Sequence, residues 1–259
     1  MSNLKKVFTE IYDSNSWTSF ESRSGLGSEL SSTETIRKEL PEVFKKFNIK
    51  NILDIPCGDF NWMSHVDMKG IEYVGADIVH KMIEDNKKQY QKYNFKVLDI
   101  TKDELPKVDL IFVRDVLGHF DYKSIENSIK NMIRSGSKYL LTTSFTKWDY
   151  NVDIQNGDWR PINLMIKPFF FKPLYLINEN CFEGDYQYDD KCLLLFELDK
   201  LFCGVKGNHK LVDFQNKEFS NGIDEMGKEL RLTESIQKKQ RHESILGLFP
   251  KKTKSLKDD

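Results

Sequence analysis

Between residues 51 and 145 the sequence alternates short apolar runs with segments of helical periodicity, and this alternation restricts the fold more than any other feature. Parallel strands need a crossover connection, usually a helix, so the pattern is typical of βαβ units. We therefore predict an α/β fold with a doubly wound, mostly parallel sheet. The expected strands lie at 51–56, 71–77, 95–99, 108–113 and 138–145, and the expected helices at 80–93 and 122–134.

The segments before and after residues 51–145 predict further elements of the same domain. Apolar residues recur at helical spacing from Thr33 to Phe47, which predicts a further helix. Two more strand candidates, 169–177 and 191–198, predict a hairpin-like pair and bring the sheet to seven strands.

The character of the chain changes near residue 200, where charged residues become dense. We expect one domain at 1–199 that opens with a polar, irregular lid segment at 1–32. A charged helical extension with a frayed tail is expected at 200–259.

Composition excludes several classes of protein. The 259 residues carry a net charge of −1, which gives no overall field that would favour nucleic acid. The N-terminus lacks the apolar run of a signal peptide, and no apolar stretch is long enough for a membrane span, so we expect a cytoplasmic protein without membrane insertion. The four cysteines form no C-x-x-C pair and have no histidine at zinc-ligand spacing, so we predict free thiols and no metal site.

Polar side chains follow the first four expected strands, and the first of these strands leads into the turn DIPCGD at 54–59. Open α/β sheets bind ligands at the carboxyl ends of their strands. Gly58 lets backbone amides approach a ligand, because it has no Cβ. Helix capping is the alternative explanation for these acidic residues. It can account for the acid at any one strand end, but it accounts poorly for polar residues at all four. The polar residues at the ends of the four strands are Asp54, Asp77, Asp99 and the pair Arg114-Asp115.

The segment NILDIPCGDF at 51–60 resembles the first motif of class I S-adenosylmethionine (SAM)-dependent methyltransferases. In that motif an acidic residue precedes a G-C-G-x-G turn. Asp54, Cys57 and Gly58 match, whereas Pro56 and Phe60 stand where the flanking glycines would be. The longer string PCGDFNWM, with SGLGS upstream and GDWRPIN downstream, resembles a bacterial subfamily over roughly residues 17–198. The resemblance implies a Rossmann-like fold, SAM as cofactor and S-adenosylhomocysteine as product.

The resemblance also implies roles for the strand ends. Asp77 would take the ribose hydroxyls, Asp99 the adenine amine, and Arg114 would line the methionine moiety. The loop at 22–29 would form a lid over the methionine carboxylate, although a flexible polar loop is the alternative. Cys57 is expected as a small residue beside the cofactor and not as a nucleophile. The expected cofactor-binding residues are Asp54, Pro56, Cys57, Gly58, Asp59, Asp77, Ile78, Asp99, Ile100, Arg114, Arg23, Gly25 and Trp17.

A nicotinamide cofactor is the rival for the same fold, and a NAD-dependent reductase or epimerase is the corresponding alternative function. Pyrophosphate binding prefers G-x-G-x-x-G at a helix N-terminus. Here Asp59 would place a negative charge beside the pyrophosphate, and Phe60 and Trp62 would crowd it. A sulfonium cofactor is locally cationic and has no pyrophosphate, so these residues favour SAM.

Methyl transfer to a hydroxyl requires alignment and a base. His119, just beyond the fourth expected strand, is the candidate base, with Asp115 or Asp121 polarising it; a histidine that only packs the turn is the alternative. The resemblance and the later loops imply a sugar, a capsule or cell-surface polysaccharide precursor, or a phosphorylated metabolite as acceptor. A non-catalytic cofactor-binding module stays open. The expected acceptor-binding residues are Trp159, Arg160, Glu183 and Asp185.

Overall fold

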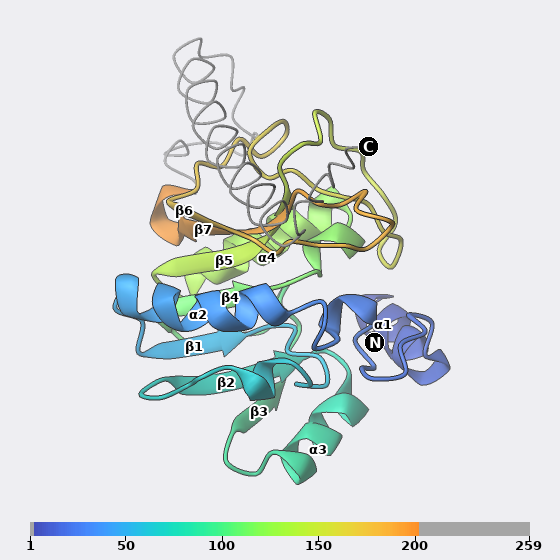
Figure 1. Ribbon diagram of the computed structural model, residues 1–259, viewed down its shortest axis with the longest axis vertical. Helices are drawn as coiled ribbons and strands as arrows, with labels where there is room; N and C mark the ends of the chain where they lie inside the picture. The colour runs from blue at the N-terminus through green and yellow to red at the C-terminus, as the bar shows by residue number, and fades with distance from the viewer. Residues whose placement is uncertain (1–2, 202–259) are drawn as a thin grey trace, which may run out of the picture. The chain divides into compact units, whose positions relative to one another are not determined.

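The computed structural model describes residues 3–201, and these form an α/β fold around a seven-stranded sheet (Figure 1). The strand order is β3-β2-β1-β4-β5-β7-β6, so the chain winds outward from β1 in both directions. This confirms the predicted doubly wound sheet. The strands are β1 (Asn51–Asp54), β2 (Glu72–Asp77), β3 (Asn94–Val97), β4 (Leu110–Val113), β5 (Tyr139–Phe145), β6 (Tyr175–Asn178) and β7 (Lys191–Glu197).

Strands β1 to β5 run parallel, whereas β7 is antiparallel to both of its neighbours, β5 and β6. The expected hairpin-like pair is therefore present. The β6 strand is shorter than predicted, because residues 169–174 lie outside any strand and the Phe169 and Phe170 amides donate to the Ile166 carbonyl. The aromatic residues of this stretch give it a composition that is typical of a strand, although it is not part of one.

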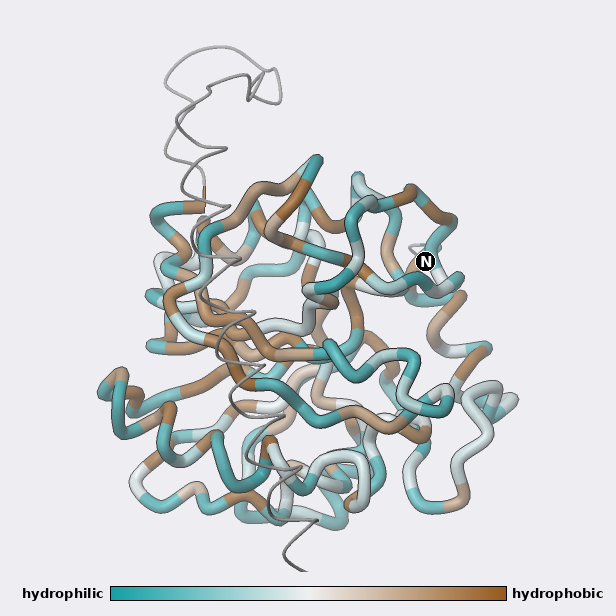
Figure 2. Tube along the Cα trace, turned by 45° about the horizontal axis from the view of Figure 1, so that its top comes forward, coloured by the Kyte–Doolittle hydropathy of each residue, from teal (hydrophilic) through white to brown (hydrophobic). Residues whose placement is uncertain are grey.

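Both faces of the sheet are buried, and the two-residue period of a strand divides the core between them. In β4, Leu110 and Phe112 pack with helix α2 (Glu34–Lys46), whereas Ile111 and Val113 pack with helix α4 (Tyr122–Arg134). Figure 2 shows hydrophobic stretches gathered along the central strands and hydrophilic stretches in the outer loops. Full burial on both sides is the physical reason for the continuous apolar run in the sequence.

Capping residues mark the two ends of helix α4. The Asp121 carboxylate accepts from the Ser124 amide at 2.6 Å and caps the first turn of α4. Gly136, with φ of 70°, follows the end of that helix in the left-handed conformation. Helix α3 (His80–Gln89) joins β2 to β3 and ends four residues earlier than predicted.

One helix was missed by the sequence prediction. The segment expected to be irregular opens with α1 (Asn3–Ser14), in which Leu4 and Phe8 are buried and Ile11 packs against the same core cluster. These three residues follow an i, i+4, i+7 spacing, but in so short and polar a segment that spacing is a weak signal. Helix α1 lies beside the carboxyl ends of the strands (Figure 1).

The helical extension expected at 200–259 lies outside the described residues, apart from Lys200 and Leu201. Within residues 3–201, no helix combines the length and the apolar character needed to cross a bilayer. Four short 3-10 turns complete the described secondary structure: η1 (Leu26–Ser28), η2 (Met63–His65), η3 (Leu117–His119) and η4 (Leu198–Lys200).

Replacing Phe60 by the glycine that the methyltransferase motif usually has at this position should destabilise the protein. The Phe60 ring is fully buried, and its centroid lies 4.8–5.3 Å from the rings of Tyr73, Tyr90, Tyr93 and Phe95. Loss of this ring lowers the free energy of unfolding by roughly 3–5 kcal/mol, while the better tolerance of glycine for this φ of 59° raises it by about 1 kcal/mol. We expect Phe60→Gly to lower the free energy of unfolding by about 2–4 kcal/mol in urea titrations. Phe20→Gly, which removes an exposed ring, is the matched control; equal losses would contradict the prediction.

Candidate active site

A cavity of about 410 Å³ opens at the carboxyl ends of the parallel strands. Its floor comes from the ends of β1, β2 and β4, and helix α1 and the N-terminal loop (residues 22–29) contribute to its wall. Loops that precede and follow β6 complete the lining. This is the position at which an open α/β sheet binds its ligands.

The turn after β1 depends on Gly58. Its φ is 54°, and a Cβ there would lie 2.1 Å from the Ser24 Oγ, so both the backbone conformation and the neighbouring loop require glycine. The Gly58 amide donates to the Asp77 carboxylate at 3.3 Å, and Cys57 donates its amide to the Ala76 carbonyl. Burial raises the pKa of the Cys57 thiol well above its ordinary value, so it is a poor nucleophile. Pro56 also lines the cavity.

Phe60 corrects one argument made from the sequence. Its ring points into the core between β2 and β3 and does not line the cavity, so it cannot crowd a pyrophosphate. Trp62 does line the cavity. The motif position tolerates phenylalanine because the side chain leaves the turn on the side of the aromatic core.

Asp59 holds the N-terminal loop against the turn. Its carboxylate accepts from the Arg23 amide at 2.7 Å, from the Ser22 hydroxyl at 3.0 Å and from the Asn61 amide at 3.3 Å. It lines the cavity as predicted, but its described hydrogen bonds go to protein groups. Asp59 therefore positions the loop that covers the cavity.

The acids at the ends of β1 and β2 are buried. Burial raises the pKa of Asp54 to about 8, although the Tyr73 hydroxyl donates to it at 2.7 Å. Burial also raises the pKa of Asp77 to about 6, and the Val79 and Gly58 amides partly offset this. The first group is neutral and the second mostly ionised at pH 7.

Asp99 follows β3 and is buried at the cavity wall. Burial works against its charge, but the Thr101 hydroxyl at 2.6 Å, the Thr101 amide at 3.0 Å and the Lys102 ammonium outweigh burial and lower its pKa. Ile78 and Ile100 line the cavity beside Asp77 and Asp99. The structure thus gathers the acids of β1, β2 and β3 at one cavity.

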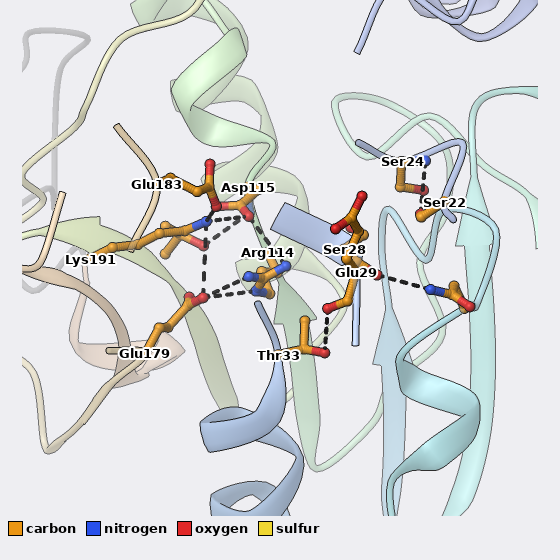
Figure 3. A network of polar contacts seen from close by, with 12 residues as sticks. Ser22, Ser24, Ser28, Glu29, Thr33, Arg114, Asp115, Glu179, Glu183 and Lys191 are labelled. Atoms are coloured by element: carbon orange, nitrogen blue, oxygen red, sulfur yellow. Dashed lines mark hydrogen bonds and ion pairs between the residues drawn. The ribbon is translucent and has the colours of Figure 1, made fainter. Parts of the chain in front are cut away.

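Beyond β4 lies a buried charged cluster of two cations and three carboxylates. Arg114 donates to the Glu179 Oε2 from Nε at 3.2 Å and from Nη2 at 2.6 Å. Lys191 donates to the Asp115 Oδ2 at 2.8 Å and lies 3.6 Å from the Glu183 Oε1. Figure 3 shows these five side chains pointing toward one another from β4, from β7 and from the loop between β6 and β7.

Pairing fixes the ionisation of this charged cluster. Burial opposes the charge on Asp115, but Arg114 and Lys191 outweigh it and lower its pKa to about 2. Burial likewise works to lower the pKa of Lys191, yet Asp115 and Glu179 hold it above its usual value. Asp115 is consequently an ionised partner of cations and a weak base.

Lys191 and Glu179 were not foreseen from the sequence. Both lie in a stretch that reads as an ordinary strand and loop, and only the β5–β7 and β6–β7 pairing brings them to the end of β4. A lysine at the start of an otherwise apolar strand, KCLLLFE, is a weak signal that its ammonium is buried with a partner. The side-chain amine is only 6% exposed.

His119 lines the cavity from the 3-10 turn η3. Its Nδ1 lies 2.9 Å from the Asp158 carbonyl oxygen, which can only accept, so Nδ1 carries the proton and Nε2 keeps the lone pair. The Trp17 ring lies 5.5 Å away between centroids, and burial lowers the pKa of the imidazole. His119 is therefore neutral at pH 7.

The partners predicted for His119 are different from those observed. Asp115 pairs with Lys191, and Asp121 caps α4 and accepts from the Asn156 side chain at 2.9 Å. A backbone carbonyl, which the sequence cannot indicate, orients the imidazole instead.

An aromatic wall of Phe145, Trp159 and Tyr188 lines the cavity near the charged cluster. The Trp159 and Tyr188 rings lie 5.1 Å apart, and Phe145 lies 6.0 Å from Trp159. Trp159 is 44% exposed, so part of its surface remains available to a ligand. Glu183 also lines the cavity, in agreement with the sequence prediction.

Three predicted site residues lie outside the cavity lining. The Arg160 guanidinium is buried, and it donates to the carbonyls of Leu117 and Gly118 at 2.9 Å, so it fixes η3 and does not face a ligand. The Arg23 and Asp185 side chains are exposed. Arg160 was misassigned because a buried guanidinium can satisfy backbone carbonyls as readily as an anion.

The N-terminal loop covers the cavity through its glycines. Gly25 has φ of 91°, and a Cβ there would lie 3.0 Å from the Trp17 Cβ. A Cβ on Gly27 would meet the carboxylates of Glu183 and Asp115 at 3.2 and 3.3 Å. The loop therefore packs directly on the charged cluster.

The charge of the cavity suits a cationic cofactor. Within residues 3–201, six carboxyl groups and two permanent cations line it. SAM carries a sulfonium and an ammonium against one carboxylate, so its net charge is complementary to an acidic lining. The apolar side chains of Ile78 and Ile100 fit its adenosine. No group of three or more metal-ligating side chains is found in the described part of the chain.

Comparison with known proteins identifies the class. The family described as "Methyltransferase domain" matches residues 30–178, and the chain belongs to it. No curated protein sequence matches the chain. Magnesium protoporphyrin IX methyltransferase of Synechocystis PCC 6803, solved with bound SAM, is 14% identical with a TM-score of 0.51, covering 76% of this chain and 98% of that one. Human N-acetylserotonin methyltransferase in complex with SAM is 13% identical with a TM-score of 0.50, covering 74% and 59%.

These two structures share the fold with this chain, and the family match assigns its chemistry. The chain is a SAM-dependent methyltransferase, and SAM is its cofactor. The nicotinamide alternative is set aside on this ground. Of the physical arguments against it, crowding of a pyrophosphate by Phe60 is wrong, whereas Asp59 and Trp62 do line the cavity.

Removing the Asp59 carboxylate should release the N-terminal loop. Charge-assisted hydrogen bonds are worth about 1.5–3 kcal/mol, so Asp59→Ala should speed hydrogen exchange of the amides at 22–28 by about tenfold or more. Asp67→Ala is the control, because that exposed carboxylate accepts from the Lys69 amide away from the loop. Unchanged exchange in Asp59→Ala would show that the loop is held by other contacts.

Proposed function

We propose that the protein O-methylates a small hydroxylated acceptor, with His119 as the general base. The observation that carries this proposal is a neutral imidazole whose Nδ1 is fixed by a backbone carbonyl at 2.9 Å, so that Nε2 is a proton acceptor at the cavity wall. A hydroxyl nucleophile needs such a group, whereas the activated methyl needs only alignment.

The acids at the strand ends support a division of the cavity into a cofactor end and an acceptor end. Asp77 and Asp99 are suited to the ribose hydroxyls and the adenine amine, beside Ile78 and Ile100. Gly58 and Asp54 face the middle of the ligand. The charged cluster, His119 and the aromatic wall then form the acceptor end.

In this proposal Asp115 is a positioning residue. It has φ of 60°, and its amide donates to the Thr143 hydroxyl at 2.9 Å. Its carboxylate pairs with Lys191, and a pKa of about 2 makes it a much weaker base than a neutral imidazole.

Bound SAM would supply an electrophilic methyl group. The acceptor oxygen would form the new C–O bond while the C–S bond breaks, and the sulfur would keep the electron pair of that bond. His119 Nε2 takes the hydroxyl proton, and the Asp158 carbonyl stabilises the resulting imidazolium through Nδ1–H.

A sugar is the acceptor that the lining supports best. Aromatic rings such as Trp159 and Tyr188 pack on the apolar face of a sugar ring, and carboxylates such as Glu183 accept from its hydroxyls. We infer that the acceptor is a sugar. The motif resemblance to a bacterial subfamily favours a precursor of capsule or another cell-surface polysaccharide.

Cofactor affinity should depend on the ionisation of Asp77. The carboxylate accepts from hydroxyls, and protonation removes that capacity, so affinity should fall as the pH falls through about 6. At pH 5 we expect about tenfold weaker binding of S-adenosylhomocysteine by titration calorimetry than at pH 7. Asp77→Asn should bind more weakly without this pH dependence, and Asp67→Asn should retain it. A flat profile in the unaltered protein would exclude Asp77 from the cofactor contacts.

Replacing His119 tests the function directly. His119→Asn should lower kcat by roughly 10²–10⁴-fold and leave the Kd for S-adenosylhomocysteine within about threefold. The measurement is release of S-adenosylhomocysteine over a panel of sugars, with His65→Asn, an exposed histidine outside the cavity, as control. Unchanged turnover in His119→Asn would refute the base. Cofactor binding without turnover on any acceptor would favour the non-catalytic binding module.

A further inference from the structure

The cations at the acceptor end of the cavity are already engaged. Among the described residues, Arg114 and Lys191 are the permanent cations that line the cavity. Arg114 donates twice to Glu179 and lies 3.3 Å from Asp115, while Lys191 donates to Asp115. Both cations are almost completely buried by these contacts. An anionic group on the acceptor would have to break them to gain a partner.

The carboxylates outnumber these cations. Asp115, Glu179 and Glu183 surround Arg114 and Lys191, so the charged cluster carries a net negative charge. The Glu183 and Asp115 side chains are each about one-third exposed, but Asp115 accepts from Lys191 at 2.8 Å, whereas Glu183 lies 3.6 Å from that ammonium. Glu183 is thus the accessible carboxylate that is less tightly paired. An acceptor bound at the aromatic wall is therefore expected to lie beside the Glu183 carboxylate.

The other groups that could hold an anion face elsewhere. Arg160 does not line the cavity; its Nε and Nη1 donate to the Val152, Leu117 and Gly118 carbonyls, and its Nη2 is buried without a hydrogen-bond partner among the described residues. His119 is neutral, and its Nδ1 proton goes to the Asp158 carbonyl. The described cavity thus has no cation free for a phosphate or carboxylate.

We propose that the site selects an uncharged, polyhydroxylated acceptor, such as a neutral glycoside, and rejects phosphorylated sugars, nucleotide sugars and uronic acids, with Glu183 as the specificity-determining residue. This inference rests on the proposed function and narrows it. Glu183 accepts from acceptor hydroxyls and repels anions, while Trp159 and Tyr188 pack on the ring. Like charges brought together at a binding site cost several kcal/mol.

Matched acceptor pairs test the selection. Each pair consists of a neutral glycoside and its phosphate ester or uronic acid, and release of S-adenosylhomocysteine gives kcat/KM for both members. We expect the anionic member to be at least about a hundredfold poorer. Comparable or better turnover of the anionic member overturns the inference and leaves O-methylation of sugars intact.

Glu183→Gln tests the residue itself. Removing its charge should narrow the difference between the two members about tenfold, chiefly by raising kcat/KM for the anion. Glu126→Gln, on the outer surface of α4 where that acid pairs with Lys123 and Lys130, should leave the ratio unchanged. An unchanged ratio in Glu183→Gln would remove Glu183 from the specificity assignment.

A binding measurement separates this inference from the proposed function. Inorganic phosphate is titrated into protein saturated with S-adenosylhomocysteine, and Tm is followed. Phosphate stabilises proteins in general, so the rise in Tm of Glu183→Gln is compared with that of the unaltered protein at each phosphate concentration. The Tm of Glu183→Gln should rise more than that of the unaltered protein, and Glu126→Gln, which keeps the site intact, should rise as the unaltered protein does. Equal rises in Glu183→Gln and the unaltered protein overturn the inference. Rejection of phosphate together with no methylation of any sugar refutes the proposed function while the charge selection stands.

Discussion

The buried charged cluster at the end of β4 constrains the whole acceptor end of the cavity. Charges removed from water must be paired, and breaking one pair leaves the partner with a large desolvation cost. Arg114 and Asp115 therefore fix where Glu179 and Lys191 lie, and with them the ends of β6 and β7. Gly27 then lets the N-terminal loop close on the same charges, because a Cβ there would lie only 3.2–3.4 Å from Glu183, Asp115 and Lys191.

This arrangement joins two tasks at one edge of the sheet. In the proposed function the cofactor end depends on the acids at the ends of β1, β2 and β3. Burial raises the pKa of Asp54, whereas the Thr101 hydrogen bonds and the Lys102 ammonium outweigh burial and lower the pKa of Asp99. The acceptor end depends on fixed pairs and a neutral histidine. The loop held by Asp59 covers both ends, so cofactor binding and enclosure of the acceptor share one element.

Particular residues show how far prediction from sequence reached. The cavity contains the predicted strand-end acids, His119, Trp159 and Glu183, because the carboxyl ends of parallel strands meet at one edge whatever the details of packing. Phe60 and Arg160 were misjudged for a common reason. The sequence names the side chain but not the direction it takes from the backbone, and these two turn toward the aromatic core and the carbonyls of η3.

By itself the sequence determined the α/β alternation, the doubly wound sheet and the order of polar strand ends, since these follow from periodicities of two and 3.6 residues and from chain connectivity. Only the tertiary structure decided that α1 covers the cavity, that Asp59 holds the N-terminal loop and that Lys191 reaches Asp115 across 76 positions of sequence. Such contacts depend on strand pairing and on how buried charges find partners, and neither leaves a local pattern in the chain.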